Sequence, residues 1–200
     1  LVGEAKGEKI WTNGEASTIA GTIMNVVFDN SHQKGYDIYQ NMTNVYHFLA
    51  NMYKANNKGK MPIEEYMENL PFAESHPSKG LIAISEIAPS RTRGSFFTAA
   101  LTTLRLFTSP RIYSMTNESD FRLQDLGREK IALFIILPDE KTTYYSLASL
   151  LISQIYEQLI KVADSRGGRL KRRVNFILDE FGNFTQIPDF GTKLTVGGGR

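Results

Sequence analysis

The chain has 200 residues, a formal net charge of +2, 42% hydrophobic and 22% charged residues, and no cysteine. This balance is that of an ordinary globular protein, and the lack of cysteine excludes disulfide frameworks, thiolate zinc sites and cysteine nucleophiles. No run approaches the roughly 18 apolar residues of a membrane-spanning helix, and the near-neutral charge means that any nucleic-acid contact must come from local patches.

Helical signals dominate the first half of the sequence. Residues 12–15 have the Thr-to-Glu spacing of a capping box, which predicts that a helix begins there and continues into the apolar residues that follow. Proline is favoured in the first turn of a helix, so Pro62 and Pro77 are each predicted to begin one. Apolar residues at helical spacing predict two further helices, over residues 45–52 and 94–107.

The second half is predicted to alternate strand and helix. Residues 131–137 and 174–178 are continuous apolar runs, which are typical of strands buried on both faces. An amphipathic helix is predicted between them, over residues 143–163. This order implies a parallel pair of strands with a right-handed crossover, in which ligands bind at the carboxyl ends of the strands. The acids at those ends are Asp139, Asp179 and Glu180.

Asp179 and Glu180 follow an apolar run directly, an arrangement typical of the Walker B element of P-loop NTPases. The first acid of such a pair helps to hold Mg²⁺ through water, and the second orients or deprotonates the attacking water. Taken alone, the pair fits two acids that end a strand and cap the next turn equally well. Asn183 could position water or bind a phosphate oxygen, although a turn residue is the simpler interpretation.

A Walker A element, G-x-x-x-x-G-K-[ST], is absent from the sequence. Gly197 to Arg200 are glycine-rich but lack the Lys and Ser/Thr that the pattern requires. Without this phosphate-binding loop, the chain alone is not expected to bind ATP tightly.

Basic residues form two clusters that could follow a phosphate backbone without reading its sequence. The denser cluster comprises Arg166, Arg169, Lys171, Arg172 and Arg173, and the looser one Arg91, Arg93, Arg105 and Arg111. Charge runs are more often simply solvated faces, and Phe96, Phe97 and Phe107 near the looser cluster have the spacing of core residues. The three histidines, His32, His47 and His76, lack metal-ligand spacing.

Three segments near the end of the chain together resemble the signature of the TraG/TraD family of conjugal-transfer coupling proteins. They are Asn175 to Asn183, which includes Asp179, Glu180 and Phe181, then Ile187-Pro188-Asp189-Phe190, and then a glycine-rich loop that ends at Arg200. Residues 10–16 and 133–139 are also similar to this family, particularly to its Gram-positive and conjugative-transposon branch. The resemblance extends over essentially the whole chain.

The resemblance implies a mixed fold, in which an all-helical domain is inserted into a RecA-like α/β (P-loop NTPase) core with parallel strands. Residues 1–115 are then expected to be the inserted helical domain, and residues 116–200 part of the nucleotide-binding core. Walker A and a membrane anchor are expected before Leu1, so both ends are expected to be cuts in a longer protein. The parent would be a homo-hexamer at the cytoplasmic face of the bacterial membrane. This piece would be a soluble chain that could exist as a monomer and would not contact the membrane directly.

Site roles follow from the resemblance position by position. Asp179 resembles the magnesium-site acid and Glu180 the catalytic acid, whereas Arg200 aligns with an arginine that would offset charge on the phosphoryl group bound by a neighbouring subunit. Gly198 departs from the pattern, because many members carry an arginine there. An alternative role for Arg200 is contact with its own sheet or with DNA.

The function that this resemblance implies is ATP-driven delivery of conjugative DNA, with its relaxase, to a type IV secretion channel. ATP and Mg²⁺ would be cofactors of the parent protein, and DNA, relaxosome proteins and channel components its partners. One alternative is a non-enzymatic helical module that binds DNA or relaxosome proteins. Another is a different DNA-pumping ATPase of the FtsK/HerA type.

Overall fold

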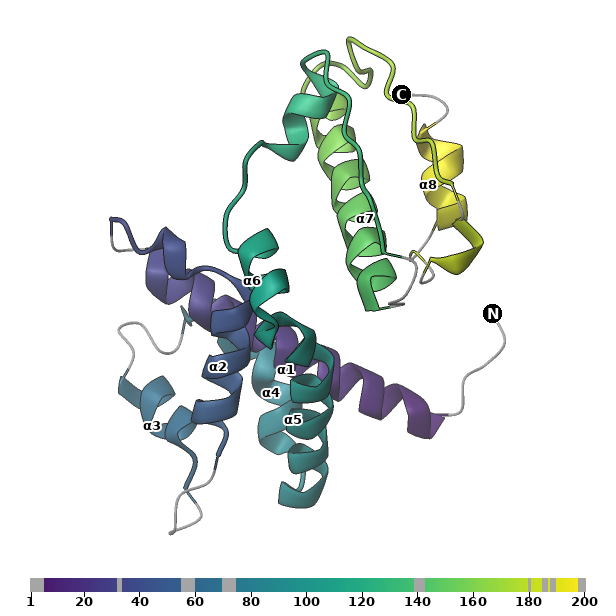
Figure 1. The fold of residues 1–200 in the computed structure, drawn as a ribbon. Coiled ribbons are helices and arrows are strands. Elements are labelled where there is room, and N and C mark those ends of the chain that lie inside the picture. Colours follow the sequence, from purple (N-terminus) through teal and green to yellow (C-terminus); the bar gives the residue numbers. More distant parts are fainter. Residues whose placement is uncertain are drawn as a thin grey trace. The chain divides into compact units, whose positions relative to one another are not determined.

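Helices are the only regular secondary structure among the residues that the structure describes (Figure 1). The computed structural model describes residues 6–31, 34–54, 60–69, 75–138, 143–179, 181–184, 187 and 190–197. The chain divides into two units, Leu1–Glu118 and Ser119–Arg200, and each is described by itself below.

Unit 1 is a helical bundle around α1. Its elements are α1 (Lys6–Ser31), η1 (Asp37–Tyr39), α2 (Met42–Met52), α3 (Pro62–Asn69), α4 (Pro77–Ile87), α5 (Ser90–Leu104), η3 (Arg105–Thr108) and α6 (Pro110–Thr116). Unit 2 is built on one long helix. Its elements are η4 (Leu123–Gly127), α7 (Thr143–Asp164), η5 (Phe181–Asn183) and α8 (Phe190–Gly197).

Local signals at the helix ends have mixed outcomes. The prediction that Pro62 and Pro77 begin helices is confirmed, and the His76 side chain caps α4 by accepting a hydrogen bond from the Ser78 backbone N–H. The prediction of a capping box at residues 12–15 is wrong, because α1 is already helical from Lys6. Glu15 instead accepts a hydrogen bond from the Thr103 hydroxyl of α5.

The contact between α1 and the neighbouring helices depends on small residues. A Cβ at Gly14 would overlap the Phe96 ring of α5, and one at Gly21 would overlap Ile82 of α4. Because these glycines carry no side chain, the helix backbones approach closely enough for Thr18 of α1 to share a hydrogen bond of 2.8 Å with Ser85 of α4. The α1–α4 interface is therefore close and unusually polar.

Two buried polar groups in unit 1 are unsatisfied. Asn25 of α1 is 0% exposed, and neither atom of its side-chain amide has a hydrogen-bond partner among the described residues. The hydroxyl of Tyr53, which follows α2, is likewise buried without a hydrogen bond of normal geometry. Burial raises the pKa of Tyr53 to about 12; the nearby Thr22 side chain opposes this shift, and Glu86 adds to it.

The apolar core of unit 1 lies between α2, α3 and α5. Leu49 of α2 and Ala100 of α5 are fully buried, and Phe97 packs with Met61 and Ile63 at the start of α3. Tyr53 extends this cluster, since its ring centroid lies 4.4 Å from that of Phe97. Apolar burial therefore stabilises this side of the bundle, whereas hydrogen bonds and close backbone contact connect α1 to α4.

The predicted helix over residues 143–163 is confirmed as α7, although its buried face differs from the predicted one. The apolar spacing predicts an inward face of Leu147, Leu150, Leu151, Ile155 and Leu159. Ile155 and Leu159 are buried as predicted, whereas Leu150 is exposed and Ala148 and Ile152 are buried in addition. The face is shifted because tyrosine and alanine also contribute to it, Tyr145 among them.

The prediction of a RecA-like core with parallel strands is wrong for the residues that the structure describes. Residues 131–138 and 174–178 do not form strands, although both runs are antiparallel to α7 (Figure 1). Phe134 is 84% exposed, and Ile136 and Ile177 are each 91% exposed. A run of apolar residues signals burial, but a strand also requires hydrogen bonds to a neighbouring strand, and the two runs form no such ladder with each other.

No helix within the described part of the chain is long and apolar enough to cross a membrane.

Replacing Asn25 by Leu is predicted to stabilise the protein by about 1–3 kcal/mol, because it removes an unsatisfied buried amide and leaves an apolar group of similar branching. Thermal and urea unfolding would measure this change. Asn13→Leu on the exposed side of the same helix is the control, with an expected change within about 0.5 kcal/mol. A loss of stability in Asn25→Leu would show that the amide has a partner.

Tyr53→Phe is predicted to reduce the loss of stability at high pH. The folded-state pKa of about 12 lies above the ordinary value of 10.0, so folding favours the neutral phenol. This contribution is present in full below pH 10 and is lost as the pH rises towards 12, by at most about 3 kcal/mol. Urea unfolding between pH 9 and pH 12 tests it against Tyr113→Phe, which alters an exposed tyrosine. Identical pH profiles for wild type and Tyr53→Phe would contradict it.

Candidate functional site

The apolar residues before Asp179 lie along helix α7. Val174, Phe176 and Leu178 line a groove against α7, whereas Ile177 between them is almost fully exposed. Val174 and Leu178 are half-buried and Phe176 is 41% exposed, so the extended chain lies along the groove with one side against it and is only partly covered. Asp179 follows in a turn and is exposed, so this acid lies where an anchored segment meets solvent.

The groove beside this segment has a volume of about 280 Å³ and is mainly apolar. Its polar members come from α7 and α8. Lys193 of α8 donates a hydrogen bond to Ser153, lies 3.8 Å from the Glu157 carboxylate, and lies 5.9 Å from the centroid of the Tyr156 ring. The groove therefore holds the extended segment by apolar contact, and its lysine is engaged by partners on α7.

A cluster of aromatic rings fixes the chain just after the acids. The Phe184 ring centroid lies 5.5 Å from that of Tyr145 on α7 and 5.5 Å from that of Phe181, and Phe181 lies 4.8 Å from Phe190 of α8. Ile187 is also buried, at 3% exposure. The residues after the acids thus pack back onto the first turn of α7, with each ring pair contributing about 0.5–1.5 kcal/mol beyond area burial.

Sequence reasoning missed this anchoring role. The family pattern includes Phe181 and Phe190 without a structural role for them, and it does not include Phe184. The signal was present, because three phenylalanines fall within ten residues of one another in a segment interrupted by Gly182, Asn183 and Pro188. Aromatic residues in such a segment indicate that it packs against a neighbouring element.

The structure places only some of the predicted nucleotide-site residues. Glu180 and Arg200 lie outside the described residues, as does Asp139. Asn183 ends η5, and its side chain is outside the described part of the chain. Asp179 is therefore the one predicted side chain of this site that is located, and the roles of the others stay predictions.

The donor set around Asp179 can be tested against Mg²⁺. Within the described residues, no three His, Asp or Glu side chains gather closely enough to hold a metal ion. Magnesium at nucleotide sites is commonly bound by one or two carboxylates, with water and phosphate oxygens as its other ligands. One exposed carboxylate fits an ion that arrives with a nucleotide, and it does not fit a metal held by protein ligands alone.

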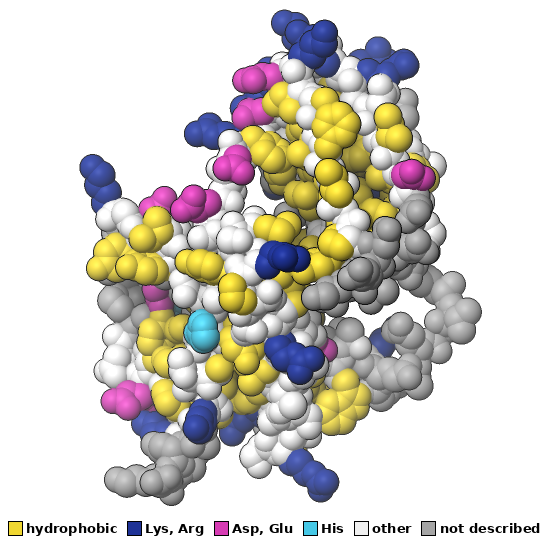
Figure 2. Space-filling view, in the orientation of Figure 1, with side chains coloured by type: hydrophobic (Ala, Val, Ile, Leu, Met, Phe, Trp, Pro, Cys, Tyr) yellow, Lys and Arg dark blue, Asp and Glu magenta, His cyan; other side chains and the backbone are white. Residues whose placement is uncertain are grey.

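The denser basic cluster lies in the segment that follows α7, residues 165–173, which we call the basic loop. Its five cations are all exposed: Arg166, Arg169, Lys171, Arg172 and Arg173. Lys and Arg side chains gather at this end of unit 2 in the space-filling view (Figure 2). The sequence-based grouping of these residues thus corresponds to one surface.

The three phenylalanines near the looser basic cluster are not exposed. Phe96, Phe97 and Phe107 are all buried in the core of unit 1, so they cannot stack on nucleobases. His76 is buried and contacts Asp29 at 3.3 Å in addition to capping α4, whereas His47 is exposed. The three phenylalanines and His76 therefore have structural roles in unit 1.

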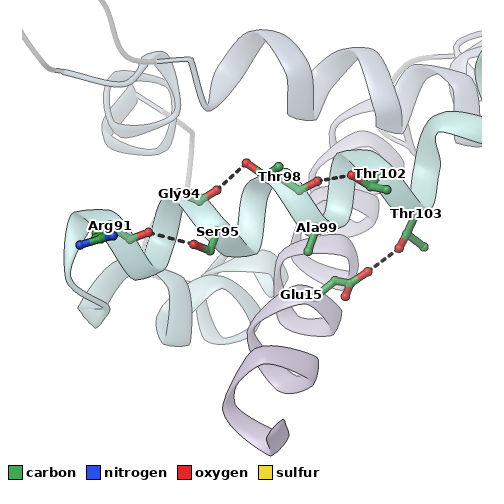
Figure 3. Close-up of a pocket in the computed structure, with 8 residues that line it drawn as sticks. All are labelled: Glu15, Arg91, Gly94, Ser95, Thr98, Ala99, Thr102 and Thr103. Atoms are coloured by element: carbon green, nitrogen blue, oxygen red, sulfur yellow. Dashed lines mark hydrogen bonds between the residues drawn. The ribbon is translucent and has the colours of Figure 1, made fainter. Parts of the chain in front are cut away.

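An open hollow of about 700 Å³ lies on α5, with Glu15 of α1 at its edge (Figure 3). Ser95, Thr98 and Thr102 each donate a hydrogen bond to the backbone carbonyl four residues earlier, and Thr103 donates to Glu15. The described lining contains no histidine, and Arg91 and Glu15 are its charged members. This chemistry suits docking of a partner and lacks an activated nucleophile.

Comparison with known proteins identifies one family. The model of the type IV secretory system conjugative DNA transfer family matches residues 5–199, nearly the whole chain. Searches among curated proteins and among solved structures give no significant match. The matched range includes the extended segment, Asp179, the aromatic cluster and the basic loop, so the chain belongs to the type IV secretory system conjugative DNA transfer family.

Proposed function

We propose that the chain is part of a coupling protein that uses ATP to deliver conjugative DNA, with its bound relaxase, to a type IV secretion channel. The family match over residues 5–199 carries this proposal, since the role of the family is conjugative DNA transfer. The same match disfavours the alternative of an FtsK/HerA-type pump.

The chain contributes one half of a nucleotide site in this proposal. Asp179 would hold Mg²⁺ through water, and the exposed position of Asp179 at the end of an anchored segment supports this role. Bound Mg²⁺ would neutralise charge on the nucleotide phosphates. Glu180 would orient or deprotonate the attacking water, and Arg200 would offset charge at the site of a neighbouring subunit.

Assembly and placement belong to the same proposal. Since Walker A is absent from the sequence, the phosphate-binding loop would come from another part of the full-length protein. That protein would act as a homo-hexamer at the cytoplasmic face of the membrane, with nucleotide bound between subunits. Without that nucleotide, residues 1–200 alone would be monomeric.

In the full-length protein, Glu180→Gln is predicted to lower ATP turnover by about 100-fold or more while ATP binding stays within a few-fold, because the amide cannot accept the proton. Asp179→Asn is predicted to weaken ATP binding in Mg²⁺ but to leave binding in EDTA unchanged. Steady-state hydrolysis and nucleotide-binding assays measure these effects, and conjugation frequency should fall with turnover.

Glu129→Gln is the matched control, because it alters an exposed acid of unit 2 outside the predicted site. It should leave turnover and conjugation unchanged. Full turnover in Glu180→Gln would remove this residue from catalysis. Equal nucleotide affinity of wild type and Asp179→Asn in Mg²⁺ would remove Asp179 from the magnesium site.

A second candidate function, a docking module, is favoured by the hollow on α5. Its volume of about 700 Å³ and its hydroxyl lining offer hydrogen-bond acceptors to a partner without offering reactive groups. In this role unit 1 would bind a relaxosome protein, and unit 2 would supply the half-site.

Ser95→Arg combined with Thr98→Arg is predicted to abolish retention of relaxosome proteins by the immobilised chain, because two long cations would fill the hollow. Pull-down at micromolar concentration measures retention. Thr116→Arg, on the exposed surface of α6, is the control and should bind as wild type does. Absence of retention by the wild-type chain itself would contradict the docking role.

A further inference from the structure

The basic loop differs in charge from the rest of the chain. Its nine residues carry five cations and no acid, so the remaining residues hold 18 Lys and Arg against 21 Asp and Glu, a net charge of −3. Within the described residues, Lys60, His76 and Lys193 form ion pairs, and none of these pairs involves the five cations of the loop. Positive charge is therefore densest in this short segment, and the rest of the chain has a slightly negative net charge.

The backbone of the loop is fixed where it leaves α7. The Gly168 N–H donates to the Ala163 carbonyl at 2.9 Å, and the Gly167 N–H donates to the Asp164 carbonyl at 3.4 Å. Gly167 and Gly168 have φ of +81° and +94°, values that a residue with a side chain adopts only with strain. This is the Schellman pattern of a helix end, and it turns the chain back immediately after Arg166.

Apolar anchors hold the loop farther along. Leu170 packs so close to Gly127 that a Cβ at Gly127 would lie 3.2 Å from Leu170 and 2.9 Å from Leu159 of α7. Val174 enters the groove against α7 four residues later. Because the loop is attached at Gly168, Leu170 and Val174, the cations between these points are held on the surface in a defined segment.

We propose that the basic loop is a sequence-independent contact for the phosphate backbone of DNA. This inference rests on the proposed function in DNA transfer and assigns a surface to the transported substrate. Four of the five cations are arginines, whose planar guanidinium groups bind phosphate oxygens in pairs. The loop has no aromatic residue for stacking on a base, so its contacts are to the backbone and do not select a sequence.

Structural explanations account for only part of this charge. Cations near the C-terminal end of a helix complement its dipole, but the effect is confined to the last turn. Lys161 and Arg166 satisfy that need at the end of α7. Arg172 and Arg173 lie beyond the Leu170 anchor and outside the reach of the dipole. An anionic membrane is a weaker partner, because the one apolar residue of the loop, Leu170, is engaged by packing.

The test uses residues 1–200 and a fluorescein-labelled 30-base-pair DNA, its separated single strand, and a second unrelated sequence. The variant is Arg169→Gln, Arg172→Gln and Arg173→Gln together. Fluorescence anisotropy is expected to show at least about a tenfold loss of affinity at 0.1 M salt, equal for both sequences. The slope of log K against log salt is expected to fall by about 2–3. A variant with lysine at all three positions should retain most of the affinity.

The matched control replaces three exposed arginines of unit 1, Arg91, Arg105 and Arg111, by glutamine. It lowers the net charge equally and should leave DNA affinity within about twofold. Equal losses in the two triple variants would overturn the proposal, because the binding would then reflect net charge alone. An unchanged DNA affinity in the loop variant would also overturn the proposal. So would a loop variant that keeps its DNA affinity but no longer sediments with phosphatidylglycerol vesicles, because the loop would then bind a membrane.

The loop and the proposed nucleotide half-site can be judged separately. In the full-length protein, the loop variant should keep ATP turnover measured without DNA and lose DNA affinity. Glu180→Gln should keep DNA affinity and lose turnover. Loss of DNA affinity with normal turnover in the loop variant supports the loop assignment even if Glu180→Gln proves fully active.

Discussion

The buried face of α7 is the constraint on which the rest of unit 2 depends. The extended segment, η4 and the aromatic cluster all pack against this helix. Leu170 packs near its C-terminal end and Phe184 near its N-terminal end, so the chain between them runs back along the helix. From Tyr145 to Asp164 the helix is roughly 28 Å long at 1.5 Å per residue. The basic loop therefore lies near the C-terminal end of the helix, and the extended segment carries Asp179 roughly 20 Å back along it.

Unit 1 depends on a different kind of contact. The glycines of α1 allow close backbone approach to α4 and α5, but Thr18 and Ser85 meet there through their hydroxyls, and Asn25 of the same helix is buried with an unsatisfied amide. Buried polar groups without partners reduce the stability that burial would otherwise give. The α1–α4 contact therefore contributes less free energy per unit area than the apolar core around Phe97. We expect α1 and α4 to separate more readily than α2 and α5 do.

The sequence predicted correctly those helices whose position depends on interactions within a few residues. Proline at the first turn located α3 and α4, and apolar spacing located α7, because these effects act within a few residues. The start of α1 at Lys6 was missed because its interface uses glycine and threonine, which leave no apolar stripe. The strand prediction failed because pairing with a second strand is a long-range property. The surface position of the basic loop followed from composition alone, whereas the anchoring of Asp179 by phenylalanines required the packing to be seen.

The separation along α7 limits how the two proposed activities of unit 2 can communicate. Arg173 and Asp179 are separated by six residues of extended chain, roughly 20 Å, and the field of a charge across that distance is strongly screened at physiological salt. Communication must therefore pass through packed structure, and α7 with the extended segment beside it is the element that contacts both ends. A displacement of the loop at Leu170 would be transmitted through Val174, Phe176 and Leu178 to the turn that carries Asp179. DNA contact and nucleotide chemistry would then be coupled by the register of this segment on α7 rather than by direct electrostatics.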